Sequence, residues 1–179
     1  MWRASTKEAI DLENTSITID KIKYMENKGK IKIDFTNQTE TSADQLSGVF
    51  SEPADPVFYE TLNELRSSVQ VILDLPDEMT ARLIPYAVAF NYNADGRMGA
   101  VITSRVLIPS TGKETTISTP LMKCYEGGND EAKCFTSGTA KKLWALEKGA
   151  RRYLSGERAQ QNLFNGEAPE QTAPAAIEE

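Results

Sequence analysis

Residues 30–36, Lys-Ile-Lys-Ile-Asp-Phe-Thr, decide how this sequence folds, because polar and apolar side chains alternate without a break. Successive side chains of a β-strand point to opposite faces, so Ile31, Ile33 and Phe35 share one face and the charged residues share the other. This alternation is typical of an antiparallel strand with one face on the core and one in water. We therefore expect a sheet that is covered on one side only.

A strand is also predicted on the N-terminal side of this stretch, over residues 17–24, with a turn at 26–29 between the two. Asp20 and Lys21 interrupt the alternation of this strand, which predicts a β-bulge. After a polar loop, residues 46–50 predict a third strand. The first third of the chain thus reads as a set of antiparallel strands.

An amphipathic helix follows, and its start is marked by Asp55 as N-cap and Pro56 at the first helical position. Its apolar residues recur at steps of 4, 3, 4 and 3: Phe58, Leu62, Leu65, Val69 and Ile72. The helix is expected to end before Pro76, because the residue before a proline disfavours helical geometry.

The rest of the chain repeats this order of elements. Strands are predicted over 84–92, 98–108 and 114–119, with Ile84, Tyr86 and Val88 on one face of the first, and a polar loop over 125–137. A second helix follows Thr139 as its cap and either ends near Gly156 or continues to Phe164. The fold class is therefore α+β, with antiparallel sheet in a strands-helix-strands-helix order that resembles a βββα unit used twice.

Three segments are expected along the chain: a polar N-terminal arm over 1–16, a single α+β domain over 17–164 and a disordered acidic tail over 165–179. The arm carries scattered charges and lacks the apolar core of a signal peptide, and no window is apolar enough to span a membrane. We expect a cytoplasmic protein with no membrane partner.

Composition argues against catalysis. The 179 residues include no histidine, which excludes Ser-His-Asp and Cys-His catalysis and His-ligated metals. We expect a binding protein that is not an enzyme and needs no cofactor. Cys124 and Cys134 are either two thiols or a disulfide that closes a loop, and no metal site is expected there or at the carboxylates Asp74, Asp77 and Glu78.

The net charge of −6 is distributed unevenly. Residues 17–38, 97–123 and 140–158 carry +2, +3 and +4, whereas residues 39–96 carry −8. Basic strands with aromatic residues between them are typical of proteins that hold single-stranded nucleic acid, since lysines neutralise phosphates and rings stack on bases. The alternative explanation is that lysines on the solvent-exposed face of a strand keep the protein soluble and prevent edge-to-edge aggregation of sheets.

The residues predicted to bind nucleic acid lie on the first hairpin and on the second block of strands. They are Lys21, Lys23, Tyr24, Lys28, Lys30, Lys32, Tyr92, Arg97 and Arg105. A further aromatic and basic group on the second helix contains Trp144 and Arg151, which are seven residues apart and share a helix face. It is either another docking face or a tryptophan of the core.

Residues 97–103, Arg-Met-Gly-Ala-Val-Ile-Thr, together with Ser118-Thr119-Pro120, resemble a family of small, mostly uncharacterised phage and prophage proteins. The resemblance covers roughly residues 17–160 and implies a bacteriophage origin and a bacterial host cell. The order of elements is also similar to that of Whirly and PUR-type single-stranded nucleic-acid binders, a similarity of fold alone.

These observations favour a phage-type single-stranded DNA-binding protein that acts in DNA replication or recombination. It would hold DNA on the lysine-bearing sheet face, form a homo-oligomer and use its acidic C-terminal tail for regulation or for recruiting a protein partner. The alternative is a phage interaction protein that binds and inhibits a host or anti-phage defence factor through the acidic surface of residues 39–96.

Overall fold

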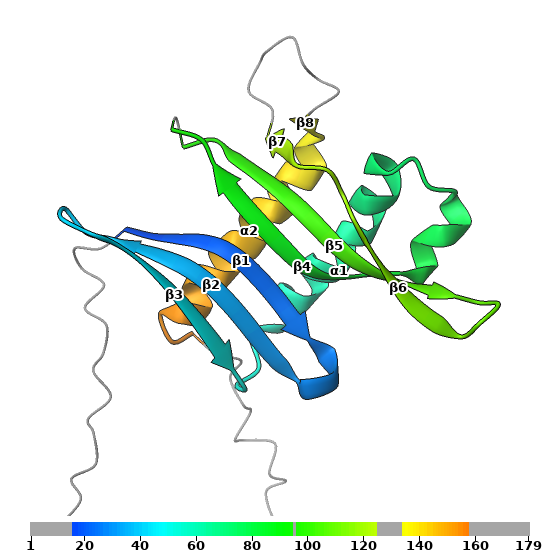
Figure 1. The fold of residues 1–179 in the computed structure, drawn as a ribbon, viewed down its shortest axis with the longest axis horizontal. Coiled ribbons are helices and arrows are strands. Elements are labelled where there is room, and N and C mark those ends of the chain that lie inside the picture. The colour runs from blue at the N-terminus through cyan, green and yellow to red at the C-terminus, as the bar shows by residue number, and fades with distance from the viewer. Residues whose placement is uncertain (1–15, 95, 125–133, 158–179) are drawn as a thin grey trace, which may run out of the picture.

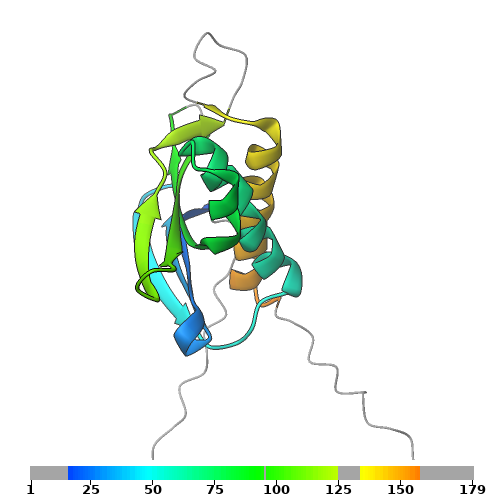
Figure 2. The ribbon, with the colours of Figure 1, turned by 90° about the vertical axis from the view of Figure 1, so that its right-hand side faces the viewer.

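A computed structural model describes residues 16–94, 96–124 and 134–157. These residues form one open sheet and a layer of helices on a single face of it, as Figures 1 and 2 show. The strands are β1 (Ser16–Met25), β2 (Lys30–Gln38), β3 (Ala43–Phe50), β4 (Leu83–Tyr92), β5 (Met98–Ile108), β6 (Lys113–Ser118), β7 (Met122–Cys124) and β8 (Cys134–Phe135). The α-helices are α1 (Pro56–Ile72) and α2 (Ser137–Leu154), and two 3-10 helices are η2 (Glu26–Lys28) and η3 (Asp77–Arg82).

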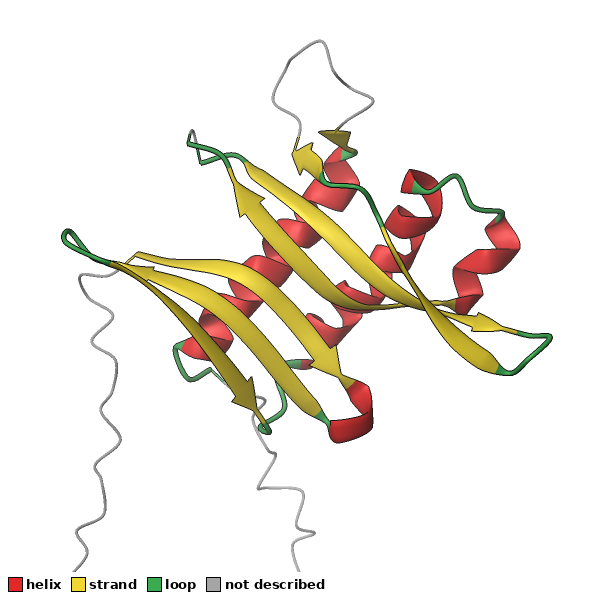
Figure 3. Cartoon of the chain, viewed as in Figure 1, coloured by secondary structure: helices red, strands yellow, loops and turns green. Residues whose placement is uncertain are grey.

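The sheet confirms the α+β fold class. Its eight strands run in the order β3-β2-β1-β4-β5-β7-β8, and β6 also pairs with β5. All pairs are antiparallel except β7 with β8, which the sequence did not predict (Figure 3). We call the face that the helices cover the inner face, and the opposite face the open face. Neither α-helix in the described ranges has the length and hydropathy that a membrane span needs.

The core lies between the inner face and the two helices. Ile33 of β2 and Ile102 of β5 are fully buried there, against Leu65 of α1 and Leu146 of α2. Each fully buried aliphatic side chain contributes about 1.5–3 kcal/mol through removal of its apolar surface from water. The alternation of residues 30–36 is confirmed, because Ile31, Ile33 and Phe35 are buried and their neighbours are partly exposed.

Helix α1 begins and ends as its sequence predicts. The Asp55 carboxylate accepts the backbone N–H of Val57 at 2.9 Å, and Pro56 occupies the first turn. At the other end Asp74 adopts a left-handed φ of 51°, and the N–H of Leu75 donates to the Gln70 carbonyl. This is a Schellman-type C-terminus with an aspartate in the position that glycine usually takes.

Helix α2 differs from its prediction at its start and agrees with one of the two predicted ends. Its N-cap is Thr136, whose hydroxyl accepts the Thr139 N–H at 3.2 Å, so Thr139 is not the cap. It ends at Leu154, which agrees with the predicted end near Gly156 and not with the one at Phe164, because Gly156 takes a φ of 101° and the N–H of Glu157 donates to the Arg152 carbonyl. The predicted acidic tail lies outside the described residues, as does the N-terminal arm apart from Ser16, which begins β1.

Two β-bulges occupy corresponding places in the central strands. The predicted bulge in β1 is confirmed, since the register with β2 shifts between Ile19 and Lys21. In β4 the register with β5 shifts between Pro85 and Ala87, which places a bulge at Tyr86. β1 pairs with β4 about Ile22 and Val88, so a local two-fold axis there maps each β1 residue onto the β4 residue 66 positions later (88 − 22). Asp20 therefore maps onto Tyr86, and the two bulges coincide.

The described chain accordingly consists of two similar halves. The first half, residues 16–72, contains β1, β2, β3 and α1, and the second half, residues 83–154, contains β4, β5, β6, the short β7 and β8, and α2. The predicted order of a βββα unit used twice therefore agrees with the order of elements. Helix α1 packs on β4 and β5 of the other half, α2 packs on β1 of the other half and on β8 of its own, and the two helices pack on each other.

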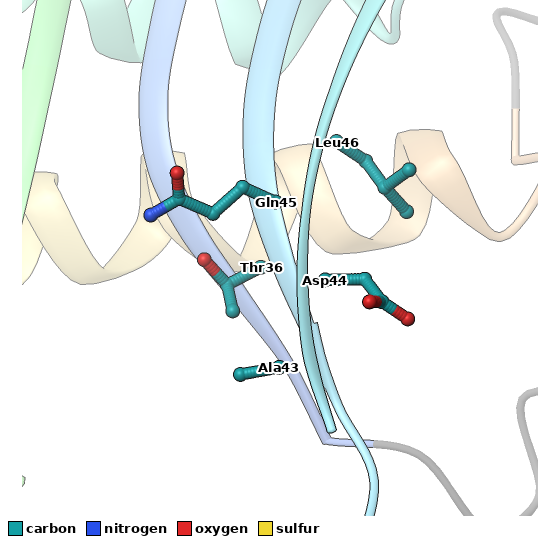
Figure 4. Close-up of a pocket in the computed structure, with 5 residues that line it drawn as sticks. All are labelled: Thr36, Ala43, Asp44, Gln45 and Leu46. Atoms are coloured by element: carbon teal, nitrogen blue, oxygen red, sulfur yellow. The ribbon is translucent and has the colours of Figure 1, made fainter.

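Strand β3 forms one edge of the sheet and is longer than the predicted 46–50. In Figure 4 the side chains of Ala43, Gln45 and the neighbouring Thr36 point to one side of the strand, and those of Asp44 and Leu46 point to the other. The hollow that these residues line is therefore part of the exposed edge and not an enclosed pocket.

Candidate nucleic-acid interface

A row of three cations and one aromatic ring crosses the centre of the open face. Lys32 of β2 lies opposite Lys23 of β1, which in turn lies opposite Ala87 of β4. Next to Ala87 the bulge places Tyr86, and Arg105 follows on β5. Because neighbouring strands are about 4.8 Å apart, this row brings side chains from four strands into one continuous surface.

The bulge in β4 is what brings the ring of Tyr86 to this surface. Regular alternation would place Tyr86 on the same face as Val88, which is the inner face, and the extra residue reverses its direction. The Lys23 ammonium lies 5.8 Å from the centroid of the Tyr86 ring, and the Arg105 guanidinium lies 5.9 Å from it. Ile84 pairs with Arg105 and likewise faces outward. The expectation that Ile84 and Tyr86 share a face with Val88 was therefore wrong.

Carboxylates hold two of the cations in place. Arg105 is paired with Glu26 of η2 and, at 3.2 Å, with Glu114 of β6. The hydrogen bond to Glu26 raises the pKa of Arg105, so this side chain remains charged at any physiological pH. Lys32 lies 3.3 Å from Asp34 on the same strand. Arg105 and Lys32 are thus partly neutralised within the protein.

The other lysines of the face have no such partner. Within the described ranges, no carboxylate lies within ion-pairing distance of Lys21, Lys23 or Lys30. Lys21 and Lys23 face outward between the bulge and the end of β1, and Lys30 faces outward at the start of β2. These three ammonium groups are the ones available to a polyanion.

Tyr24 and Tyr92 do not lie with these lysines. Tyr24 points to the inner side, where its ring packs edge-on against Tyr59 of α1 with centroids 5.0 Å apart. Tyr92 stacks on Phe90, and its hydroxyl is buried without a hydrogen-bond partner among the described residues. Burial raises the pKa of both phenols, with Tyr59 adding to the shift at Tyr24 and Glu147 to that at Tyr92.

The remaining predicted residues lie in turns. Lys28 belongs to η2 and is exposed at the tip of the β1–β2 hairpin. Arg97 lies in the β4–β5 turn, where its carbonyl accepts the N–H of Asn93 at 2.9 Å. The structure thus brings Lys21, Lys23, Lys30, Lys32 and Arg105 together on one face, and separates Tyr24, Tyr92, Lys28 and Arg97 from its centre.

The cysteines and the carboxylate cluster give less support for a functional site. Cys124 pairs in register with Phe135 and Lys123 with Cys134, so the two cysteine side chains point to opposite faces, and neither is in a disulfide. No group of three or more potential metal ligands is found among the described residues, Asp74, Asp77 and Glu78 included. The segment between the cysteines lies outside the described residues.

The aromatic and basic group on α2 belongs to the opposite layer. Trp144 is 45% exposed and so is not a core residue. Arg151 is paired with Glu147, which is itself buried, and this ion pair anchors the arginine to the helix surface.

Comparisons with family models, with curated proteins and with solved structures find no match to this chain.

Proposed function

We propose that this protein binds single-stranded DNA on the open face of its sheet and acts in phage DNA replication or recombination. The observation that carries the proposal is the row of Lys32, Lys23, Tyr86 and Arg105 across four strands. A surface that alternates cations with an aromatic ring matches both parts of a nucleic-acid strand, because phosphates are bound by ammonium groups and bases stack on rings.

The geometry favours binding without sequence preference. The unpaired lysines Lys21, Lys23 and Lys30 would contact phosphates, which carry no sequence information. Tyr86 offers a ring face, and stacking on a ring contributes about 1–3 kcal/mol per base whatever the base is. The small residues Ala87 and Ala89 beside the lysines leave room for the strand to approach the sheet.

Fluorescence anisotropy with labelled oligo-dT at low and high salt tests the proposal. Binding should weaken steeply as salt rises, because counterions are released from each neutralised phosphate. Reversing the charge of Lys21, Lys23, Lys30 and Lys32 to Glu should abolish binding while the circular dichroism spectrum stays the same.

A matched control reverses four basic residues of α2, on the opposite layer: Lys141, Lys142, Lys148 and Arg152 to Glu. This variant changes the net charge equally and should retain binding. No binding by the natural chain at low salt would refute the proposal and favour an interaction protein that uses its acidic surface. Loss of binding in the α2 variant alone would place the DNA on the helices instead.

The acidic C-terminal residues supply a second test of the same proposal. If Glu167, Glu170, Glu178 and Glu179 compete with phosphates for the lysines, deleting residues 166–179 should tighten oligo-dT binding several-fold at low salt. The gain should disappear at high salt, since both interactions are screened. Unchanged affinity at every salt concentration would mean that the tail does not regulate this face.

A further inference from the structure

A cleft of about 330 Å³ opens where the two central strands separate. β1 and β4 pair over only three positions, and the last of them joins Lys23 to Ala87. Beyond it β1 continues to Met25 without pairing with β4, so the two strand groups diverge toward η2, as Figures 1 and 3 show. This volume is at the small end of the range of ligand pockets, about 300–1,000 Å³.

Three tyrosines from three different elements line the cleft: Tyr24 of β1, Tyr59 of α1 and Tyr86 of β4. Tyr59 is fixed, because its hydroxyl accepts the Ala54 N–H at 3.0 Å and its ring packs edge-on against Phe58. Tyr24 packs against Tyr59 in turn. The walls are therefore aromatic and held in place before any ligand arrives.

The rim of the cleft is polar and offers hydrogen-bond acceptors. Glu60 contributes a carboxylate, Asn63 contributes an amide, and Glu26 contributes the carboxylate that is paired with Arg105. These carboxylates disfavour a phosphate, whereas a neutral planar ring with N–H groups satisfies both the rim and the walls. A nucleobase is such a ligand, and every unpaired base has at least one N–H donor on its pairing edge.

Tyr86 and Arg105 line the cleft, and both also belong to the row of cations across the open face. A strand whose phosphates lie on Lys23 would therefore pass directly over the opening. We propose that this cleft takes one unpaired base of the bound strand, turned out from the sheet face and stacked among the three tyrosines. The inference rests on the proposed DNA binding and adds a base-binding site to it.

The test compares oligo-dT of about 12 nucleotides with an abasic strand of the same length, which has the same phosphates and no bases. The natural chain should bind oligo-dT about tenfold more tightly than the abasic strand, as expected for the stacking of one base. Tyr24→Leu should reduce this ratio several-fold, because one of the three rings around the base is lost, and leave the affinity for the abasic strand unchanged.

Asn63→Trp is a second variant, because an exposed helix position tolerates a bulky side chain that fills the cleft. It should reduce the ratio in the same way even if Tyr24→Leu is destabilised. The control Trp144→Leu removes an exposed ring from the helix layer and should keep the tenfold ratio.

The outcomes separate the two proposals. Binding of both strands with equal affinity, or a ratio that neither cleft variant changes, would overturn the base site and leave DNA binding in place. Failure of both strands to bind would overturn the proposed function itself.

Discussion

The two halves of the molecule follow the same plan and present different surfaces. On the inner face equivalent positions match: Ile33 of the first half corresponds to Ile102 of the second, and both are fully buried. On the open face equivalent positions differ. Lys21, Lys23, Lys30 and Lys32 correspond to Ala87, Ala89, Gly99 and Val101.

This difference separates what folding needs from what a ligand needs. Both halves require an apolar inner face, because that face excludes water from the helices. The open face has no such requirement, and there the first half is basic whereas the second half is small and nearly uncharged. A binding function that depends on charge therefore belongs to the first half, with Arg105 as the contribution of the second.

The largest expected effect tests whether the two halves are equivalent in the core. Ile33→Ala and Ile102→Ala should each lower the free energy of unfolding by about 3–4 kcal/mol, because each leaves a cavity at a fully buried site. Chemical denaturation measures both. A loss below about 1 kcal/mol at either position would contradict its place in the core.

The next prediction concerns a double substitution that removes the difference between the open faces of the two halves. Lys21→Ala with Lys23→Ala gives the first half the residues of the second at these positions. Oligo-dT affinity should fall about tenfold at low salt, and the slope of log affinity against log salt should decrease by about 1.4, for two lost phosphate contacts. Lys141→Ala with Lys148→Ala, on the helix layer, is the control. An unchanged slope in the sheet variant would mean that these lysines do not contact phosphates.

A smaller loss of stability is expected when the N-cap of either helix is removed, and the two losses can be compared. Asp55→Ala and Thr136→Ala each remove a side chain that accepts a backbone N–H of the first turn. Each should cost about 1 kcal/mol of unfolding free energy. Asp55→Asn and Thr136→Ser keep the acceptor and should restore most of the loss, and failure of both to do so would indicate another cause.

The smallest effect concerns the ends of the helices, where Asp74 and Gly156 hold equivalent left-handed positions. Asp74→Gly should stabilise the fold by about 0.5 kcal/mol, and Gly156→Asp should destabilise it by about 1 kcal/mol, because a side chain is strained at positive φ. Thermal unfolding of the pair should shift in opposite directions. Shifts of the same sign would contradict the equivalence of the two helix ends.

Local patterns were sufficient to predict most of the fold. The alternation of residues 30–36 and the capped apolar spacing of α1 depend only on neighbours along the chain, and both are confirmed. The pairing of β7 with β8 joins short segments across a long loop, so no local pattern shows it. The sequence left two ends open for α2 because apolar residues continue past Gly156, and the helix ends near that glycine, which is itself a stop signal.

The site was harder to predict because faces depend on register. Tyr24 directly follows Lys23, so alternation alone should have placed them on opposite faces. Tyr86 was missed because the bulge in β4 reverses its direction, although Pro85 directly before it was a signal of that bulge, since proline inside a central strand occurs mainly at bulges. The lysines of β2 were placed correctly on the face opposite the core, since no bulge interrupts their strand.

Helix α1 packs on β4 and β5 of the second half and α2 packs on β1 of the first, and this exchange has a consequence for assembly of the fold. Because each half depends on the helix of the other to cover its strands, a fragment of residues 16–76 should remain unfolded alone, and so should a fragment of residues 77–157. Mixed together, they should recover the native spectrum, as two pieces that complement each other. The halves resemble two chains that have exchanged helices, joined by a single peptide segment that makes their encounter intramolecular.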